Sequence, residues 1–298
     1  MAASKYFPGI PSDWSETSIR TANDQLHIRI WYKKNLSNNV RTLLLVHGQA
    51  EQSDRYIHFP FYLHQNIDCI FAVDLPGHGM SKGVRGHIEN FDQYSSAVLS
   101  LINSAQDWLR GQNKSYVLHL LGHSLGGLIT LRTCLKNPDL PLQSVTVSAP
   151  LLDLAIKVPP VKKFFGELVE PVLGFLKIDN ELKSEQISHD PEVILEYHQN
   201  PLNHHWVTPR FFVNMMKETA LMRENTTEFP FPLMIVTPLA DPIVSWKAQY
   251  DFFKKLKMKN NKRKCLQSFP GFFHEPFNEI GKERAFIALA NWLESCSK

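Results

Sequence analysis

The chain has 298 residues, of which 43% are hydrophobic and 20% are charged, and its formal net charge is +3 at neutral pH. This composition excludes a disordered or fibrous protein, and the near balance of charges gives no support to a nucleic-acid partner. The length lies at the upper edge of what one hydrophobic core holds, so we expect one large domain with an insertion.

The sequence shows no pattern typical of a signal peptide or of a membrane span. The N-terminal residues lack the apolar stretch of a signal peptide, and no segment approaches the about 18–20 apolar residues that a membrane span needs. The four cysteines are scattered without metal-ligand spacing, which is typical of reduced thiols. We therefore expect a cytoplasmic protein, with peripheral membrane contact and signal-independent secretion as alternatives, and with no metal or organic cofactor.

Apolar runs alternate with amphipathic helical patterns, which is typical of an α/β protein with a mostly parallel central sheet flanked by helices. Strands are predicted over residues 26–31, 42–47, 69–74, 116–122, 144–148, 233–237 and 264–269. The later runs are continuously apolar, as in parallel strands that are covered on both faces. Helices are predicted over residues 90–109, 126–137 and 281–294, where apolar side chains recur at helical spacing.

The pattern changes between residues 151 and 229. This stretch is helical in character, is interrupted by prolines and contains no convincing strand, and a buried strand resumes only after residues 229–232. We therefore predict a core formed by residues 1–150 and 230–298, with residues 151–229 inserted between late strands as a helical cap. Such a cap would lie over the carboxyl edge of the sheet, where ligands bind in open parallel sheets.

A G-H-S-L-G motif at residues 122–126 follows the strand at 116–122 directly and opens the next helix. This context is the one that a nucleophilic serine requires, because a sharp strand-to-helix turn presents its hydroxyl above the sheet. Small residues two positions before and after the serine leave room for the turn. Ser124 is therefore the predicted nucleophile, and the positive end of the helix dipole would favour developing negative charge beside it.

A serine hydroxyl is a weak nucleophile at neutral pH, so it needs a base and the base needs an orienting acid. In this arrangement the chain order is serine, then acid, then histidine. Asp241 and His274 occupy loops that follow two late strands, and so lie at the predicted edge of Ser124. Asp153 is the alternative acid. Other histidines are excluded by position, because His119 lies within a strand and two more, at 204 and 205, lie in the insertion.

The reaction also needs donors for the negative charge that develops on the carbonyl oxygen. The backbone N–H of Leu125, the residue after the nucleophile, is one predicted donor. The second is expected in the loop after the strand at 42–47, and we predict the backbone N–H of Gln49. Gly48 would allow this loop to approach the substrate, and His47 is interpreted as structural.

Several motifs resemble those of the monoacylglycerol lipase and lysophospholipase branch of the α/β-hydrolases, which includes serine aminopeptidase-like proteins. Residues 47–56, HGQAEQSDRY, are similar to H-G-x-x-E-H-S-x-R-Y. Residues 74–83, DLPGHGMSKG, are similar to D-x-x-G-H-G-x-S-x-G, and residues 85–94 to R-G-H-[IV]-x-x-F-x-x-Y. The sequence departs from the pattern at Gln52, where the family has histidine, and at Gln49, whose long side chain would narrow the pocket.

The resemblance implies an α/β-hydrolase fold, a Ser124–Asp241–His274 triad, oxyanion donors at Gln49 and Leu125, and a cap that admits lipid chains. Large apolar side chains at 156–178 agree with a lipid substrate, although they would equally pack the cap onto its own core. The candidates for substrate contact are Phe164, Phe165, Leu168 and Leu173.

The expected activity is hydrolysis of a single-chain lipid ester, a monoacylglycerol or a lysophospholipid, through an acyl-enzyme. The cap would make transient contact with a membrane surface. The alternatives are an aminopeptidase-type or general carboxylesterase activity and, more distantly, a non-catalytic binding protein. An aminopeptidase would need acidic cap residues for a substrate ammonium group, and the available glutamates are at 167, 170, 181, 185, 192 and 196.

Overall fold

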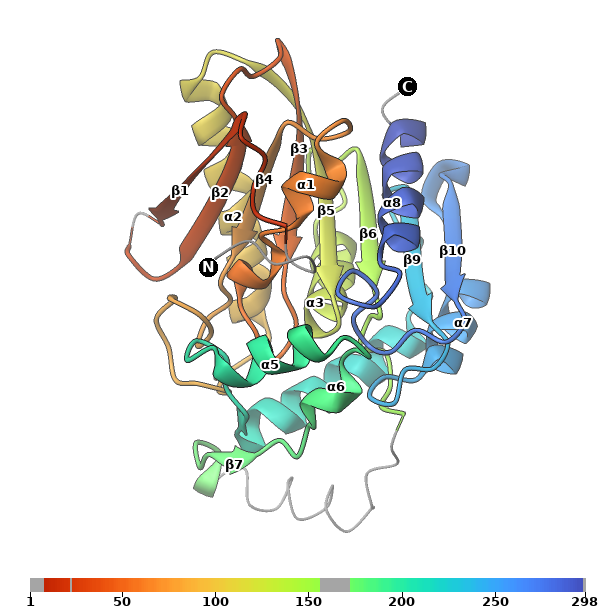
Figure 1. The fold of residues 1–298 in the computed structure, drawn as a ribbon. Coiled ribbons are helices and arrows are strands. Elements are labelled where there is room, and N and C mark those ends of the chain that lie inside the picture. Colours follow the sequence, from red (N-terminus) through yellow and green to blue (C-terminus); the bar gives the residue numbers. More distant parts are fainter. Residues whose placement is uncertain (1–7, 22, 156–171, 297–298) are drawn as a thin grey trace.

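A central eight-stranded sheet organises the protein, whose computed structural model describes residues 8–21, 23–155 and 172–296 (Figure 1). The strand order is β1-β2-β4-β3-β5-β6-β9-β10. Strand β2 is antiparallel to β1 and β4, and all other neighbours are parallel. The strands are β1 (Trp14–Arg20), β2 (His27–Lys33), β3 (Asn39–Val46), β4 (Cys69–Val73), β5 (Ser115–His123), β6 (Ser144–Ser148), β9 (Leu233–Pro238) and β10 (Lys264–Phe269).

The predicted mostly parallel α/β architecture is confirmed, and each of the seven predicted strands is present. The strand of the central sheet that the apolar pattern did not predict is β1. Its residues are exposed or half-buried apart from Trp14, because the strand lies at the edge of the sheet. An edge strand of this kind carries little of the apolar pattern from which strands are recognised.

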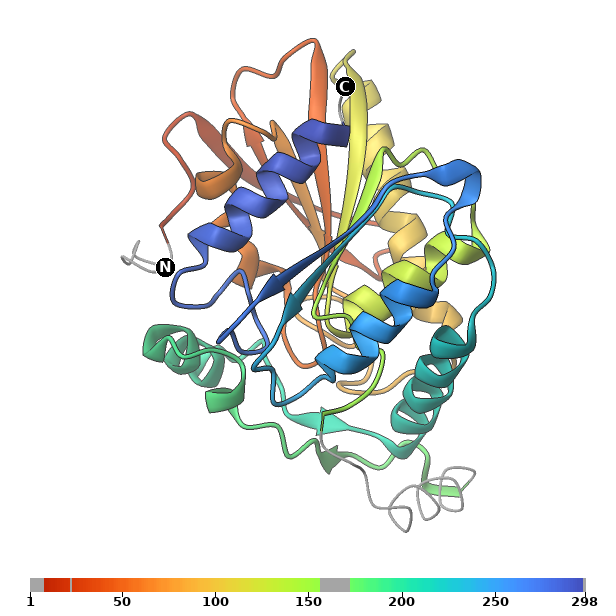
Figure 2. The same ribbon diagram turned by 90° about the vertical axis from the view of Figure 1, so that its right-hand side faces the viewer.

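Helices cover both faces of the sheet, as Figure 2 shows. Along β3, the side chains of Val40, Leu44 and Val46 join one hydrophobic cluster and those of Leu43 and Leu45 join the other, as the alternation of a strand requires. On the first face lie α2 (Asp92–Gly111), α3 (Leu125–Lys136) and α7 (Trp246–Lys255), and on the second α1 (Phe59–Leu63) and α8 (Glu283–Cys296). Short 3-10 helices span Ser53–Tyr56, Ser184–Gln186 and Lys259–Asn261.

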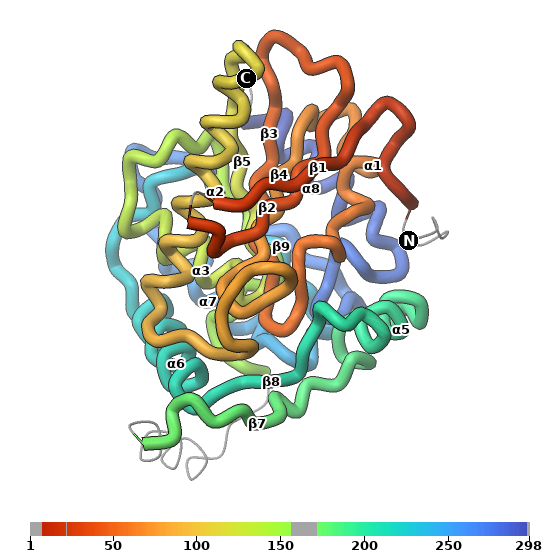
Figure 3. Tube along the Cα trace, turned by 90° about the vertical axis from the view of Figure 1, so that its left-hand side faces the viewer, coloured from red at the N-terminus to blue at the C-terminus, as the bar shows by residue number. Residues whose placement is uncertain are grey.

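The segment between β6 and β9 leaves the sheet and crosses its carboxyl edge (Figure 1). Its described elements are β7 (Ile178–Asp179), α5 (Pro191–Gln199), β8 (Trp206–Val207) and α6 (Pro209–Glu224). Strands β7 and β8 form a small antiparallel pair, which the sequence had not indicated (Figure 3). We call the described residues 172–229 the insertion.

Backbone hydrogen bonds join the insertion to three loops of the core. The N–H of His204 donates to Ala50 after β3, the N–H of Thr208 donates to Gly86 after β4, and Ile187 accepts from Glu275 after β10, at 3.2, 3.0 and 2.9 Å. The insertion is therefore anchored at the edge where the parallel strands end. Within the described residues, no helix has the length and hydropathy that crossing a bilayer demands.

Helix α3 starts unusually close to the backbone of β3. A side chain at Gly126 would place its Cβ 2.3 Å from the Val46 carbonyl oxygen and 2.4 Å from that of His47. A side chain at Gly122 would place its Cβ 2.3 Å from the Gly126 carbonyl oxygen. The two glycines of the motif therefore allow β5, the turn and α3 to pack against the end of β3.

Replacing Gly126 by alanine is expected to destabilise the fold by at least about 1–3 kcal/mol, because backbone atoms must move to admit the methyl group. Gly111→Ala is the matched control, since a Cβ at Gly111 meets no atom within 4 Å. Urea titration measures the free energy of unfolding of both variants. If Gly126→Ala unfolded at the same midpoint urea concentration as the wild type, the close packing of α3 against β3 would be contradicted.

Candidate active site

Ser124 lies in the turn between β5 and α3 in a strained backbone conformation, with φ of 52° and ψ of −116°. Left-handed backbone of this kind costs about 1–3 kcal/mol for a residue with a side chain, and it persists only where the surroundings enforce it. Here the Ser124 N–H donates to the Ser148 carbonyl at 2.9 Å, and the Ser124 carbonyl accepts from Leu151 at 3.0 Å. These bonds hold the turn that the motif predicted.

His274 brings the two other predicted residues together. Its Nε2 lies 2.9 Å from Ser124 Oγ, and its Nδ1 lies 2.8 Å from Asp241 Oδ2. The second Asp241 oxygen, Oδ1, accepts the backbone N–H groups of Ile243 and Val244 at 2.8 and 3.0 Å. Because the carboxylate accepts, Nδ1 carries the proton, and Nε2 of the neutral ring is free to accept a proton from the hydroxyl.

The pKa of His274 is set by opposing effects. Burial alone lowers the pKa, but the Asp241 carboxylate, followed by Glu275 and Glu51, outweighs burial and raises it above the ordinary value of 6.5. A neighbouring ring, that of His123, lies 4.9 Å away between centroids. Burial and the proximity of His274 lower the pKa of His123 to about 4, so His123 is neutral near pH 7.

The alternative acid lies elsewhere. Asp153 Oδ2 pairs with Arg223, and its side chain is 36% exposed. The excluded histidines are also apart from Ser124: His119 Nδ1 lies 2.8 Å from Ser144 Oγ within the sheet, and His204 contacts the ring of His78. The geometry therefore favours Asp241 over Asp153 as the partner of His274.

The two residues predicted to supply oxyanion donors, Gln49 and Leu125, lie near the serine in the structure. Leu125 is the first residue of α3, where a backbone N–H has no acceptor within the helix. Gln49 lies in the loop after β3, and a Cβ added to the adjacent Gly48 would come within 3.1 Å of Ser124 Cβ. The amide of the Gln49 side chain lies between His78 Nε2, at 3.2 Å, and the Trp206 carbonyl, at 3.4 Å.

A pocket opens onto Ser124 and His274 and receives side chains from both the core and the insertion. Its lining residues are Gly48, Gln49, Glu51, His123, Ser124, Leu182, Lys183, Ser184, Ile187, Tyr197, Ile243, His274 and Glu275. Of the four predicted substrate contacts, Leu173 is 42% exposed and does not line this pocket, whereas residues 164, 165 and 168 lie outside the described residues. The insertion residues that line it, including Ile187 and Tyr197, carried no recognisable motif.

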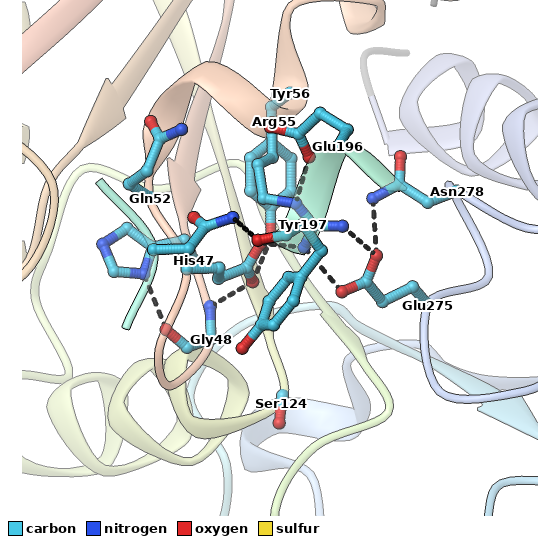
Figure 4. A network of polar contacts seen from close by, with 12 residues as sticks. His47, Gly48, Gln52, Arg55, Tyr56, Ser124, Glu196, Tyr197, Glu275 and Asn278 are labelled. Carbon is cyan, nitrogen blue, oxygen red and sulfur yellow. Dashed lines mark hydrogen bonds and ion pairs between the residues drawn. The ribbon is translucent and has the colours of Figure 1, made fainter. Parts of the chain in front are cut away.

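A buried ion cluster forms the wall behind the pocket (Figure 4). The Arg55 guanidinium donates to both oxygens of Glu275 at 2.6 and 2.8 Å, to Glu51 at 2.9 Å and to Glu196 at 3.1 Å. The centroid of the Tyr197 ring lies 5.0 Å from Cζ of Arg55. The Arg55 side chain is fully buried, so these carboxylates supply the compensation that a buried guanidinium needs.

The structure explains the departure from the family pattern at Gln52. Gln52 is fully buried, and its side-chain oxygen accepts the Asp54 N–H at 2.6 Å at the start of the 3-10 helix Ser53–Tyr56. Glutamine at this position therefore caps the helix that carries Arg55.

A family model described as serine aminopeptidase, S33, matches residues 37–281. The phospholipase YtpA of Bacillus subtilis is 25% identical, over 84% of this chain and 93% of its own length. A monoacylglycerol lipase of Mycolicibacterium smegmatis is 23% identical, over 85% of this chain and 88% of its own. An uncharacterised abhydrolase domain-containing protein of Dictyostelium discoideum is 29% identical over 93% of this chain, which spans 28% of that protein.

Solved structures agree on the fold. The monoacylglycerol lipase of Paleococcus ferrophilus superposes with a TM-score of 0.76 at 24% identity, covering 95% of this chain and 99% of that one. A soluble variant of the Saccharomyces cerevisiae monoglyceride lipase, in complex with a substrate analogue, gives a TM-score of 0.77 at 20% identity, covering 98% of both chains. The chain therefore belongs to the serine aminopeptidase S33 family of the α/β-hydrolases, in the branch that resembles the monoacylglycerol lipases.

Proposed function

We propose that this hydrolase cleaves the carboxylic ester of a single-chain lipid through an acyl-enzyme formed on Ser124. The observation that carries the proposal is the unbroken chain of contacts from Asp241 through His274 to the Ser124 hydroxyl, at 2.8 and 2.9 Å, on the wall of a pocket. Serine, histidine and a carboxylate in this order are the groups that acyl transfer requires.

The chemistry follows from the tautomer of His274. Its Nε2 takes the Ser124 proton as Oγ attacks the ester carbonyl, and the Gln49 and Leu125 N–H groups bind the oxyanion. His274 then gives that proton to the departing alcohol, which leaves the acyl group on Ser124. A water molecule that loses a proton to His274 next attacks the acyl carbonyl, and return of the proton to Ser124 releases the fatty acid.

Support for a lipid comes from the pocket and from the relatives. Leu182, Ile187 and Ile243 give the pocket apolar walls suited to an acyl chain, beside the polar wall formed by Glu51 and Glu275. A relative named phospholipase and others named monoacylglycerol lipases cover most of this chain. We propose that the insertion acts as a cap over this site and that the substrate is a monoacylglycerol or a lysophospholipid.

An aminopeptidase activity is the second candidate, and the ion cluster favours it. Three carboxylates, from Glu51, Glu196 and Glu275, contact the single guanidinium of Arg55, so acidic groups outnumber basic ones behind the pocket. A surplus of carboxylates would attract a substrate ammonium group. The same carboxylates are already engaged by Arg55, which limits the contacts that they can offer to a substrate.

Ser124→Ala is expected to lose at least about 10³-fold in turnover, as removal of a nucleophile does in serine hydrolases. The measurement is a rate panel of glycerol monoesters of graded chain length, lysophospholipids and an aminoacyl arylamide. If the arylamide were cleaved faster than every ester, the protein would be assigned an aminopeptidase activity instead of lipid ester hydrolysis. A fluorophosphonate probe should label the wild type and not the variant, and an unlabelled wild type would support a binding protein without catalysis.

Activity should fall as the pH drops through the pKa of His274, because only the neutral ring accepts the serine proton. Since that pKa is raised, the acidic limb of kcat/KM should lie above pH 6.5. Asp241→Asn removes the charge that raises it, so the limb should move to lower pH while turnover falls by as much as about 10⁴-fold. Asp153→Asn is the matched control and should change neither property. If the acidic limb of kcat/KM stayed at the same pH in Asp241→Asn, the pairing of Asp241 with His274 would be contradicted.

We also propose that the insertion contacts a lipid surface. Half of the exposed large apolar side chains of the described residues fall within 172–195, among them Phe175, which is 66% exposed, and Leu176, which is 48% exposed. Exposed apolar side chains that recur within one segment can form an interaction surface.

Phe175→Ser should therefore weaken binding to phospholipid vesicles and lower turnover of vesicle-borne substrate several-fold, with turnover of a water-soluble ester unchanged. Phe61→Ser, at a 47% exposed phenylalanine of α1, is the control. Vesicle co-sedimentation measures the binding, and equal binding of both variants and the wild type would exclude this surface.

A further inference from the structure

Side chains hold the backbone on both sides of Gly48, in the peptide unit before it and in the one that joins it to Gln49. The Gly48 N–H donates to Glu51 Oε1 at 2.6 Å. The Gly48 carbonyl oxygen lies 2.7 Å from His47 Nδ1. Figure 4 shows both contacts in the loop that passes Ser124. In the proposed function the peptide unit that joins Gly48 to Gln49 supplies the Gln49 N–H to the oxyanion.

The hydrogen bonds determine the tautomer of His47. The Leu75 backbone N–H lies 2.9 Å from His47 Nε2 and can only donate, so Nε2 is the accepting nitrogen. The proton of the neutral ring is therefore on Nδ1, from which it is donated to the Gly48 carbonyl. Burial lowers the pKa of His47, although Asp74 opposes this effect, and the ring thus stays in the neutral form that both bonds need.

The geometry of the peptide bond converts this contact into a constraint on the oxyanion donor. In a planar trans peptide the C=O of one residue and the N–H of the next point in opposite directions. A hydrogen bond that holds the Gly48 carbonyl toward His47 therefore also fixes the direction of the Gln49 N–H. Glu51 fixes the preceding peptide unit, so the Gly48 backbone is restrained on both sides.

Glu51 is itself oriented by two donors from the helix that follows. Tyr56 donates to Oε1 at 3.0 Å and Arg55 donates to Oε2 at 2.9 Å. Arg55 also holds both oxygens of Glu275, the residue after His274. One buried cluster therefore ties the oxyanion loop to the loop that carries the base.

We propose that His47 and Glu51 are positioning residues that aim the Gln49 N–H at the oxyanion of the transition state. This inference rests on the proposed function, because it concerns the donor of that reaction. A position error of about 1 Å costs up to about 10²-fold in rate, and the loss of one donor costs about 10²–10³-fold. His47 does not line the pocket, so its substitutions should act on kcat rather than on KM, whereas Glu51 lines the pocket and its substitutions are judged by kcat.

Two substitutions at residue 47 separate the contacts of the histidine. In His47→Asn the amide nitrogen can occupy the position of Nδ1 and still donate to the Gly48 carbonyl. In His47→Gln the amide reaches the position of Nε2 and leaves that carbonyl without its donor. We expect His47→Gln to lower kcat by about 10- to 100-fold with KM within about twofold, and His47→Asn to recover most of the loss.

Two substitutions at Glu51 give a second, independent test. Glu51→Gln retains an oxygen for the Gly48 N–H and should stay within about fivefold of the wild-type kcat, whereas Glu51→Ala removes the acceptor and should lose about 10- to 100-fold. His119→Gln, at an equally buried histidine in β5, is the control for general destabilisation. All kcat values are expressed per serine titrated with a fluorophosphonate, so that unfolded protein does not contribute.

A trifluoromethyl ketone, which forms a tetrahedral adduct with a serine, measures the oxyanion site directly. Its affinity should fall in parallel with kcat in His47→Gln and Glu51→Ala and be unchanged in His119→Gln. Wild-type kcat per titrated serine and unchanged ketone affinity in those two variants would overturn the positioning role while leaving ester hydrolysis in place. A wild type without ester turnover and without labelling of Ser124 would instead remove the proposed function itself. If His47→Gln does not fold, the Glu51 pair decides the question.

Discussion

The left-handed backbone of Ser124 is the constraint on which the rest of the site depends. A residue with a side chain adopts this conformation at a cost of about 1–3 kcal/mol, and the surrounding structure must supply it. Strand β5, the neighbouring end of β6 and helix α3 do so together, and α3 can approach only because Gly126 has no side chain. The position of the Ser124 hydroxyl therefore depends on how β5, β6 and α3 pack together at this edge of the sheet.

Much of this architecture was accessible from the sequence because its determinants are local. The apolar runs of the parallel strands and the strand–motif–helix context of Ser124 each lie within about 20 consecutive residues, where periodicity is informative. Chain order and their positions after strands predict Asp241 and His274. In the structure Asp241 lies within hydrogen-bond distance of His274, and His274 lies within hydrogen-bond distance of Ser124. The sequence does not predict strand β1, because only Trp14 among its residues is buried and the strand has no apolar pattern.

The pocket wall could not be predicted in the same way, because its contacts join distant segments. Arg55 and Glu196 are separated by 141 positions and Arg55 and Glu275 by 220 positions, and no periodicity relates them. The insertion residues that line the pocket, such as Ile187 and Tyr197, resemble any other apolar or aromatic residues of a helical segment. Their role becomes visible only when the chain is folded over the edge of the sheet.

The shared guanidinium of Arg55 has a consequence for how this enzyme can diversify. Its Nε proton is accepted by Glu196, which belongs to the insertion, whereas its other carboxylate partners, Glu51 and Glu275, belong to the core. A chimera that carries the insertion of a relative must therefore supply a new acceptor at the same point, since a fully buried donor without one is strongly destabilising. The contact between the insertion and the core is therefore chemically specified at Arg55 and Glu196.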